Sequence, residues 1–207
     1  MKDHAEERWR SLWGRLEARG DPVPPFEDLV ARYSESHRAY HTLDHVTHCL
    51  NEFEAARTLA LEPAAVELAL WFHDAVYDPR AKDNEEKSAA LALEIARNAG
   101  FSGALGLKVA TMILASTHVA PPDDPDTRLF ADIDLSILGQ PQGVFDEYER
   151  QVRLEYAWVP EEMFRAGRSA ILRSFLERPF LYGTDFFRGK YQKAARANVE
   201  RSLLRLR

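Results

Sequence analysis

The sequence predicts one all-α domain over residues 1–207. Apolar residues recur at helical spacing along nearly the whole chain. No stretch shows the sustained alternation of apolar and polar residues that is typical of a strand, and no internal repeat is visible. The hydrophobic fraction of 45% in 207 residues is enough for one domain with its own core.

The predicted helices follow from apolar spacing. Four apolar residues three or four positions apart predict the first helix: Trp9, Leu12, Trp13 and Leu16. It ends before the turn sequence Gly20-Asp21-Pro22. The same spacing predicts helices over residues 26–33, 43–59, 64–73, 84–99, 105–117, 129–138, 144–158, 161–176 and 186–204.

Prolines and glycines mark several boundaries between these helices. Pro63 suits the first turn of the helix over 64–73, where a missing N–H costs nothing. Asp78-Pro79 ends the helical pattern that follows, and Gly100 closes the helix over 84–99. Three prolines and three aspartates predict a loop over residues 121–126.

Composition narrows the class of protein. A net charge of -6 argues against general affinity for double-stranded nucleic acid. The basic residues of the last twenty positions are interpreted as a solvated helix face. The single cysteine, Cys49, excludes an intrachain disulfide framework, and the charged N-terminus does not resemble a signal peptide. No run is apolar and long enough to span a bilayer, so we expect a cytoplasmic protein; the sequence does not indicate its oligomeric state.

The pair His73-Asp74 is the strongest chemical signal in the chain. It follows a run of five apolar residues, 68–72. A bare charge at the end of such a helix would cost several kcal/mol to bury. A divalent metal bound by the imidazole and the carboxylate would remove that cost, since both are usual metal ligands. The alternative is a structural His–Asp hydrogen bond near a helix C-terminus.

Two further segments offer ligands of the same kinds. His41, His45 and His48 are four and three positions apart and would share one face of a helix, either as ligands or as surface histidines. Asp132 and Asp134 lie among apolar residues, which implies a largely buried helix. Two carboxylates in such a place need partners, and a cation is one of them.

The order of a His, a His-Asp doublet and a distal Asp resembles the HD superfamily of metal-dependent phosphohydrolases. The segments similar to a subgroup of predicted HD phosphohydrolases are residues 38–45, 72–78, 83–89, 132–139, 152–158, 175–179 and 195–198. The resemblance covers most of the chain from about Tyr33 onward. It implies a single HD-domain helical bundle with additional C-terminal helices. It does not name a substrate.

The resemblance also implies a ligand set. His45 matches the first ligand, His73 and Asp74 the doublet, and Asp134 the last ligand. HD proteins similar to this one carry an Asp-x-Asp pair whose second member binds the metal, so Asp132 would lie behind the ligands and orient one of them. The expected cofactor is one divalent ion: Mn, Fe, Co, Ni, Zn or Mg.

Further residues are assigned to catalysis and substrate binding. Many HD nucleotide hydrolases place a Glu-Asp pair three and four residues after the doublet; here Tyr77 replaces the Glu and Asp78 is retained. Asp78 is expected to align or deprotonate the attacking water, unless it only forms an Asx-Pro turn. Glu85 is assigned to the substrate side, where it can also substitute for the missing Glu.

Two histidines complete the predicted site. His118 is expected to contact a phosphate or protonate the leaving group; the alternative is a histidine that caps a helix C-terminus. His41 is expected to contact the substrate or support a ligand, and the alternative is a surface histidine.

The function predicted from this site is hydrolysis of a phosphate ester of a small molecule, such as a nucleotide. One alternative is a non-catalytic module that binds a metal or a nucleotide. Another is an HD-fold di-iron oxygenase. The latter resembles proteins with two additional histidines between the doublet and the last Asp, where this chain has only His118.

Overall fold

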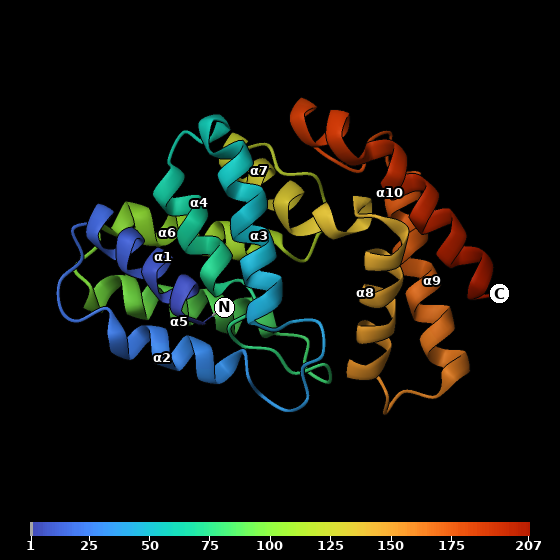
Figure 1. The fold of residues 1–207 in the computed structure, drawn as a ribbon, viewed down its shortest axis with the longest axis horizontal. Helices are drawn as coiled ribbons and strands as arrows, with labels where there is room; N and C mark the ends of the chain where they lie inside the picture. Colours follow the sequence, from blue (N-terminus) through green and yellow to red (C-terminus); the bar gives the residue numbers. More distant parts are fainter. Residues whose placement is uncertain (1) are drawn as a thin grey trace. The chain divides into compact units, whose positions relative to one another are not determined.

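The computed structural model describes residues 2–207, and in this range it contains only helices (Figure 1). The prediction of an all-α fold is therefore confirmed. The elements are α1 (Lys2–Arg15), α2 (Val23–Arg32), α3 (Leu43–Ala56), η1 (Arg57–Leu59), α4 (Pro63–Phe72), α5 (Asn84–Asn98), α6 (Gly103–Ala115), α7 (Pro125–Asp134), η2 (Leu135–Gly139), α8 (Gln142–Glu155), α9 (Glu161–Glu177) and α10 (Asp185–Arg205). The two η elements are 3₁₀ helices.

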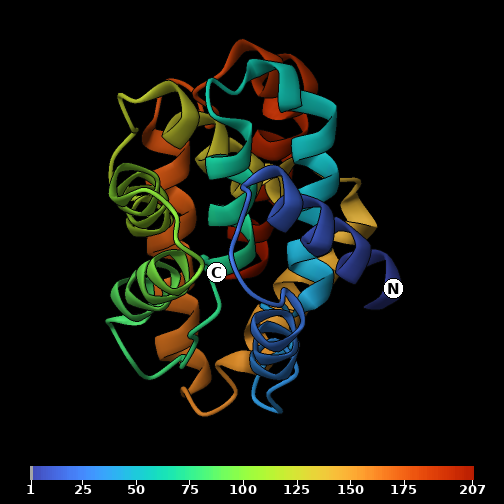
Figure 2. The same ribbon diagram turned by 90° about the vertical axis from the view of Figure 1, so that its left-hand side faces the viewer.

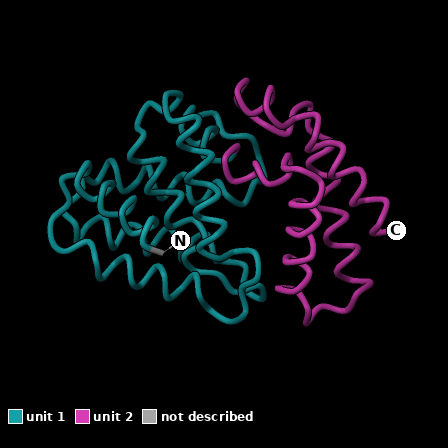
Figure 3. The backbone as a smooth tube through the Cα atoms, viewed as in Figure 1, with its two compact units in different colours: residues 1–131 teal, residues 132–207 magenta. Residues whose placement is uncertain are grey.

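The backbone contacts group the chain into two compact units, residues 1–131 and 132–207 (Figure 3). Helices α1 to α6 and most of α7 belong to the first unit. The end of α7, η2 and helices α8 to α10 belong to the second. The expectation of a single domain stays a prediction. Among residues 2–207, no helix has the length and apolar character needed to cross a bilayer.

Helix α4 is the core of the first unit. It packs against α1, α3, α5 and α6, and every residue from Ala65 to Phe72 is buried. A helix that is apolar on all sides is stable only when other helices surround it, which explains the apolar run before His73. In Figure 2 the helices α1 and α2 face the viewer. Trp9 of α1 meets α4 through Trp71, with ring centroids 5.5 Å apart.

Capping explains where the helices around the site begin. Thr42 caps α3, because its side chain accepts a hydrogen bond from the Asp44 N–H. Pro63 occupies the first turn of α4, as predicted. The α-helix of α3 ends at Ala56 and continues as a 3₁₀ turn to Leu59, so the predicted helix over 43–59 is nearly complete.

The predicted loop over residues 121–126 is wrong at its C-terminal end, because α7 already begins at Pro125. The Asp124 carboxylate accepts hydrogen bonds from the backbone N–H and the hydroxyl of Thr127, at 2.8 and 2.7 Å. An aspartate followed by proline is thus a helix start here, with the proline in the first turn. The helix predicted over 129–138 is correspondingly shifted, and its last part is the 3₁₀ helix η2.

In the second unit, η2 packs against α8 and α10. Asn198 of α10 donates to the carbonyls of Leu138 and Gln140, each at 2.9 Å. The buried Arg168 of α9 pairs with Glu149 of α8. These side chains satisfy polar groups inside the unit, so they hold its helices together.

The basic C-terminal helix is only partly a solvated face. Lys190, Lys193 and Arg205 are exposed, as expected. Arg188, however, donates to the carbonyls of Tyr182 and Gly183, both at 2.8 Å. It therefore closes the turn before α10 as well as carrying charge.

The Asp132 carboxylate has a structural role in the second unit. It accepts hydrogen bonds from the Gly183 N–H at 2.6 Å, and from the N–H and hydroxyl of Thr184 at 2.7 and 2.6 Å. Thr184 is the N-cap of α10, so Asp132 anchors the start of that helix. Burial raises the pKa of Asp132, although these hydrogen bonds oppose the shift.

Replacement of Asp132 by Ala should therefore destabilise the fold. Three donors lose their acceptor, and we expect the free energy of unfolding to fall by about 2 to 3 kcal/mol. Urea unfolding followed by circular dichroism measures the change. The matched control is Asp185→Ala, because the Asp185 side chain is 99% exposed. It should cost less than about 1 kcal/mol, and equal losses in both variants would contradict the anchoring role of Asp132.

Candidate metal centre

Three ligand atoms converge at the point where the start of α3 meets the end of α4. His45 lies in the first turn of α3, His73 is the C-cap of α4, and Asp74 follows it. The Nε2 atoms of His45 and His73 are 3.0 Å apart. Oδ2 of Asp74 is 3.1 Å from Nε2 of His73 and 3.5 Å from Nε2 of His45.

These spacings fit a single metal ion. With bonds of about 2.1 Å, two ligand atoms of one ion are about 3.0 Å apart at a right angle and about 3.4 Å apart at the tetrahedral angle. The three measured distances, from 3.0 to 3.5 Å, cover this interval. Both imidazole side chains are 1% exposed, whereas that of Asp74 is 19% exposed. The site is thus buried on the histidine side and reachable from the carboxylate side.

The tautomer of His73 is set by the backbone of α4. Its Nδ1 lies 3.0 Å from the carbonyl oxygen of Leu70. A carbonyl can only accept, so Nδ1 carries the hydrogen. In the neutral ring, Nε2 then presents a lone pair to His45 and Asp74. This is the usual arrangement of a metal-binding histidine, whose second nitrogen donates to a fixed acceptor.

The protonation of the neighbouring histidines sets the pKa of the Asp74 carboxyl. Burial raises this pKa, whereas the charges of His73, His41 and His45 and a hydrogen bond from His73 lower it well below its ordinary value when the rings are protonated. An ionised carboxylate 3.1 Å from the Nε2 lone pair of a neutral His73 is repelled unless a proton or a cation lies between them.

Arg38 joins the two segments that carry these ligands. Its side chain is fully buried, and Nη1 donates to the carbonyls of His41 at 3.0 Å and Asp74 at 2.7 Å. Nη2 donates to the carbonyl of Ala75 at 3.2 Å. The segment before α3 is therefore fixed to the segment after α4. Residue 38 lies in one of the HD-like segments, but no local feature of the sequence indicates this role.

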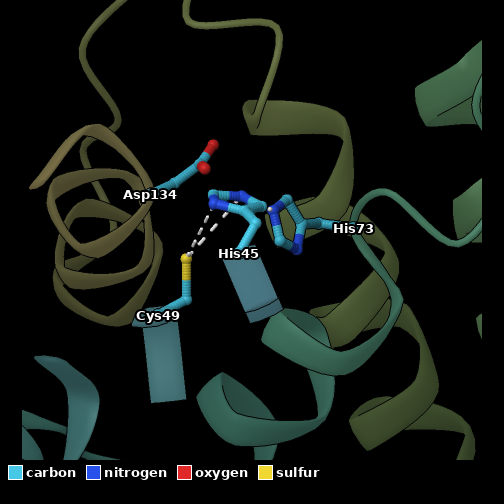
Figure 4. Close-up of side chains that lie close together, drawn as sticks. All are labelled: His45, Cys49, His73 and Asp134. Carbon is cyan, nitrogen blue, oxygen red and sulfur yellow. Dashed lines mark hydrogen bonds between the residues drawn. The ribbon is translucent and has the colours of Figure 1, made fainter. Parts of the chain in front are cut away.

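Cys49 and Asp134 also lie near the two histidines. The ligand atoms of His45, Cys49, His73 and Asp134 are all within 4.8 Å of one another (Figure 4). This group can hold a metal ion. Of the two predicted aspartates, Asp134 at the end of α7 thus joins the group, whereas Asp132 is hydrogen-bonded to the turn before α10.

Cys49 was not among the predicted residues, although it follows His45 by one helical turn. Its Sγ is 3.7 Å from Nε2 and 3.8 Å from Nδ1 of His45. Nearly equal distances place the sulfur beside the imidazole ring rather than on the line of the Nε2 lone pair. The thiol therefore packs on the ring of His45, and Asp74 is better placed to share an ion with the histidines.

His41 is placed differently from the sequence-based expectation. The expected helix face through residues 41, 45 and 48 is wrong at its first member, because α3 begins at Leu43 after the Thr42 cap. The His41 ring nevertheless lies beside the site, with its centroid 6.0 Å from that of His45. It packs on Tyr77 with a centroid separation of 4.2 Å. Tyr77 thus supports His41.

Asp78 does not lie one helical turn beyond Asp74, because α4 ends at Phe72. Beyond the helix, Arg38 donates hydrogen bonds to the carbonyls of Asp74 and Ala75. The exposed Asp78 side chain accepts a hydrogen bond from the Arg80 N–H at 2.9 Å, which is the Asx turn weighed as its alternative. Its catalytic role stays a prediction.

The two remaining predicted residues lie on other elements. Glu85 is half-buried in the first turn of α5. His118 follows α6 with φ of 52°, and its backbone N–H donates to the carbonyl of Ala115 at 3.0 Å. Neither is in the group of possible metal ligands. Their assigned roles stay predictions.

Comparison of the chain with protein-family models, with curated proteins and with solved structures finds no match. The all-helical fold and the cluster of possible metal ligands are compatible with an HD-type protein. Membership of the HD superfamily stays a prediction from the sequence motifs.

The two aspartates of the Asp-x-Asp pair should respond differently to mutation. Asp134→Ala should abolish metal retention, because it removes the predicted distal ligand, while Asp132→Ala should weaken retention less. Elemental analysis of protein loaded with Co²⁺ and then desalted measures the bound metal. If the Asp132 variant loses the metal and the Asp134 variant keeps it, the assignment of the distal ligand is wrong by two residues.

Proposed function

We propose that this protein is a metal-dependent phosphohydrolase. It binds one divalent ion through His45, His73, Asp74 and Asp134 and hydrolyses a phosphate ester of a small molecule, such as a nucleotide. The observation that carries the proposal is the convergence of the Nε2 atoms of both histidines and Oδ2 of Asp74 at 3.0 to 3.5 Å. The fixed Nδ1–H of His73 supports it, since that tautomer turns a lone pair to the site.

The residues around the proposed ion have different roles in the proposed hydrolysis. When bound, a divalent ion polarises a phosphoryl oxygen and lowers the pKa of a water molecule at the site. The side chains of His45 and His73 close the buried side and leave the Asp74 side open to substrate. Arg38 keeps the two ligand-bearing segments together. Fixed ligand positions matter because a small displacement of the reacting groups lowers the rate of the chemical step steeply.

Asp78 is the proposed base. Oδ1 of its carboxylate accepts from the Arg80 N–H, which fixes the side chain. The other oxygen remains to take the proton of the attacking water. The oxygen of that water forms a bond to phosphorus, and the bond from phosphorus to the leaving oxygen breaks. His41, held by Tyr77 beside the ligands, is the proposed contact to the phosphate.

Replacement of Asp78 by Asn tests this mechanism. Asn can still accept the hydrogen bond from the Arg80 N–H, so the turn and the metal should be retained. Loss of the basic oxygen should lower kcat by about 10²-fold or more, which is the usual contribution of a general acid–base group. The assay follows phosphate release from a panel of phosphate esters with added Mn²⁺, Co²⁺ or Ni²⁺.

The matched control is Asp83→Asn. Asp83 lies in the same segment, is exposed and pairs with Lys87 at 2.9 Å. This variant should keep the wild-type rate. Wild-type kcat in the Asp78 variant would make Asp78 a turn residue only, and Glu85 would be tested next. A wild-type protein that binds the metal but hydrolyses no ester of the panel would instead be a binding module.

A further inference from the structure

The segment from Asp74 to Asp78 leads from a proposed metal ligand to the proposed base and lies between α4 and α5. Side chains of other elements hydrogen-bond to its backbone. The Arg38 guanidinium donates to the carbonyls of Asp74 and Ala75. Three further side chains bond to the backbone of the next three residues: Ser88 to Val76, His37 to Tyr77 and Asn84 to Asp78. The conformation of the segment is thus fixed by residues outside it.

Two side chains of α5 bond reciprocally to this segment. The Asp78 N–H donates to Oδ1 of Asn84 at 3.0 Å, and Nδ2 of Asn84 donates to the Asp78 carbonyl at 2.9 Å. The hydroxyl of Ser88 accepts from the Val76 N–H at 3.0 Å and donates to the Val76 carbonyl at 3.3 Å. Asn84 and Ser88 are one helical turn apart, so they lie on the same face of α5. That face therefore binds the backbone on which the proposed base is carried.

Burial does not force the pairing of Asn84 with Asp78. Asp78 is exposed, so water could satisfy its backbone N–H and carbonyl. A carboxamide that bonds to both groups at once selects one backbone conformation at this residue instead, and the position of the Asp78 carboxylate follows from that conformation.

The bland interpretation is that Asn84 only closes the turn before α5. The turn, however, is already closed by bonds of Asp78 itself. Its Oδ1 accepts from the Arg80 N–H at 2.9 Å, and its carbonyl accepts from the Ala81 N–H at 2.9 Å. The two bonds from Asn84 add a constraint on Asp78 that the turn does not need.

We propose that Asn84 is a positioning residue for the hydrolysis. It holds the backbone of Asp78 so that the carboxylate meets the attacking water, and it touches neither the substrate nor the metal. The proposal rests on the proposed function, in which Asp78 is the base. A fixed backbone matters there because a small displacement of a reacting group lowers the rate steeply.

Steady-state kinetics of Asn84→Ala test the proposal. The assay uses Co²⁺-loaded protein and the ester of the panel that the wild-type protein hydrolyses fastest. We expect kcat to fall at least about tenfold, because the base is displaced. KM should stay within about twofold, because Asp78 acts in the chemical step rather than in binding. The bound Co²⁺, measured by elemental analysis, should equal that of the wild type.

A double variant separates positioning from a general loss of stability. If Asn84 acts only through Asp78, Asn84→Ala should cost nothing further in protein that already carries Asp78→Asn. A loss of folded protein would lower the rate in both backgrounds. The matched control is Asn98→Ala, since Asn98 is exposed at the other end of α5. This control should keep the wild-type kcat.

Asn84→Asp is a second variant that should fold. A carboxylate suits the first turn of a helix, and it still accepts from the Asp78 N–H although it no longer donates to the carbonyl. Its kcat should lie between those of the wild type and Asn84→Ala.

The possible failures are distinguishable. A wild-type kcat in Asn84→Ala, together with a loss in Asp78→Asn, would remove the role of Asn84 and leave the proposed function standing. Independent losses that multiply in the double variant would make Asn84 a structural residue only. A metal-loaded wild type that hydrolyses no ester, or a wild-type kcat in Asp78→Asn, would overturn the proposed mechanism and the role of Asn84 with it.

Discussion

The burial of α4 on all sides is the constraint on which the rest of the first unit depends. Helices α1, α3, α5 and α6 surround it, so its last residues lie in the protein interior rather than in water. A buried imidazole and a buried ionised carboxylate at that end need hydrogen-bond partners or a compensating positive charge. His45 from α3 supplies a second imidazole at 3.0 Å, and the two imidazoles and the carboxylate together are a donor set that suits a divalent cation.

The same helix carries two polar points with different surroundings. Glu67 lies near the middle of α4, and His73 and Asp74 follow its last residue. Arg15 and Arg57 pair with Glu67, so its buried charge is balanced within the protein. The neighbours of Asp74 are imidazoles, which balance its charge only when they are protonated. The second point can therefore attract a cation, whereas the first is part of an ion-pair network.

Local patterns in the sequence predicted the fold well, because most of its helices are marked by their own residues. Pro63 at the start of α4 and the periodicity over 43–59 are local signals, and the structure places the elements accordingly. The start of α7 was misjudged because Asp124-Pro125 fits both a loop and a helix cap. Only the hydrogen bonds to Thr127 decide between these two possibilities.

The candidate metal centre could be predicted only in part, because only some of its residues have a local signal in the sequence. The doublet at 73–74 stands out after an apolar run, and His45 was found through its motif. Arg38 and Cys49 were missed, since their roles depend on contacts across the fold: carbonyls beyond α4 for the first and the ring of His45 for the second. The ion pairs of Glu67 with Arg15 and Arg57 had no linear signal either, because the three residues come from separate elements.

The most direct test of the central claim is anomalous diffraction from a crystal of the protein loaded with Co²⁺. We expect one strong anomalous peak within about 2.3 Å of Nε2 of His45, Nε2 of His73 and Oδ2 of Asp74. A crystal that shows no peak at these atoms, or a cobalt ion bound through Cys49 with Asp74 turned away, would contradict it.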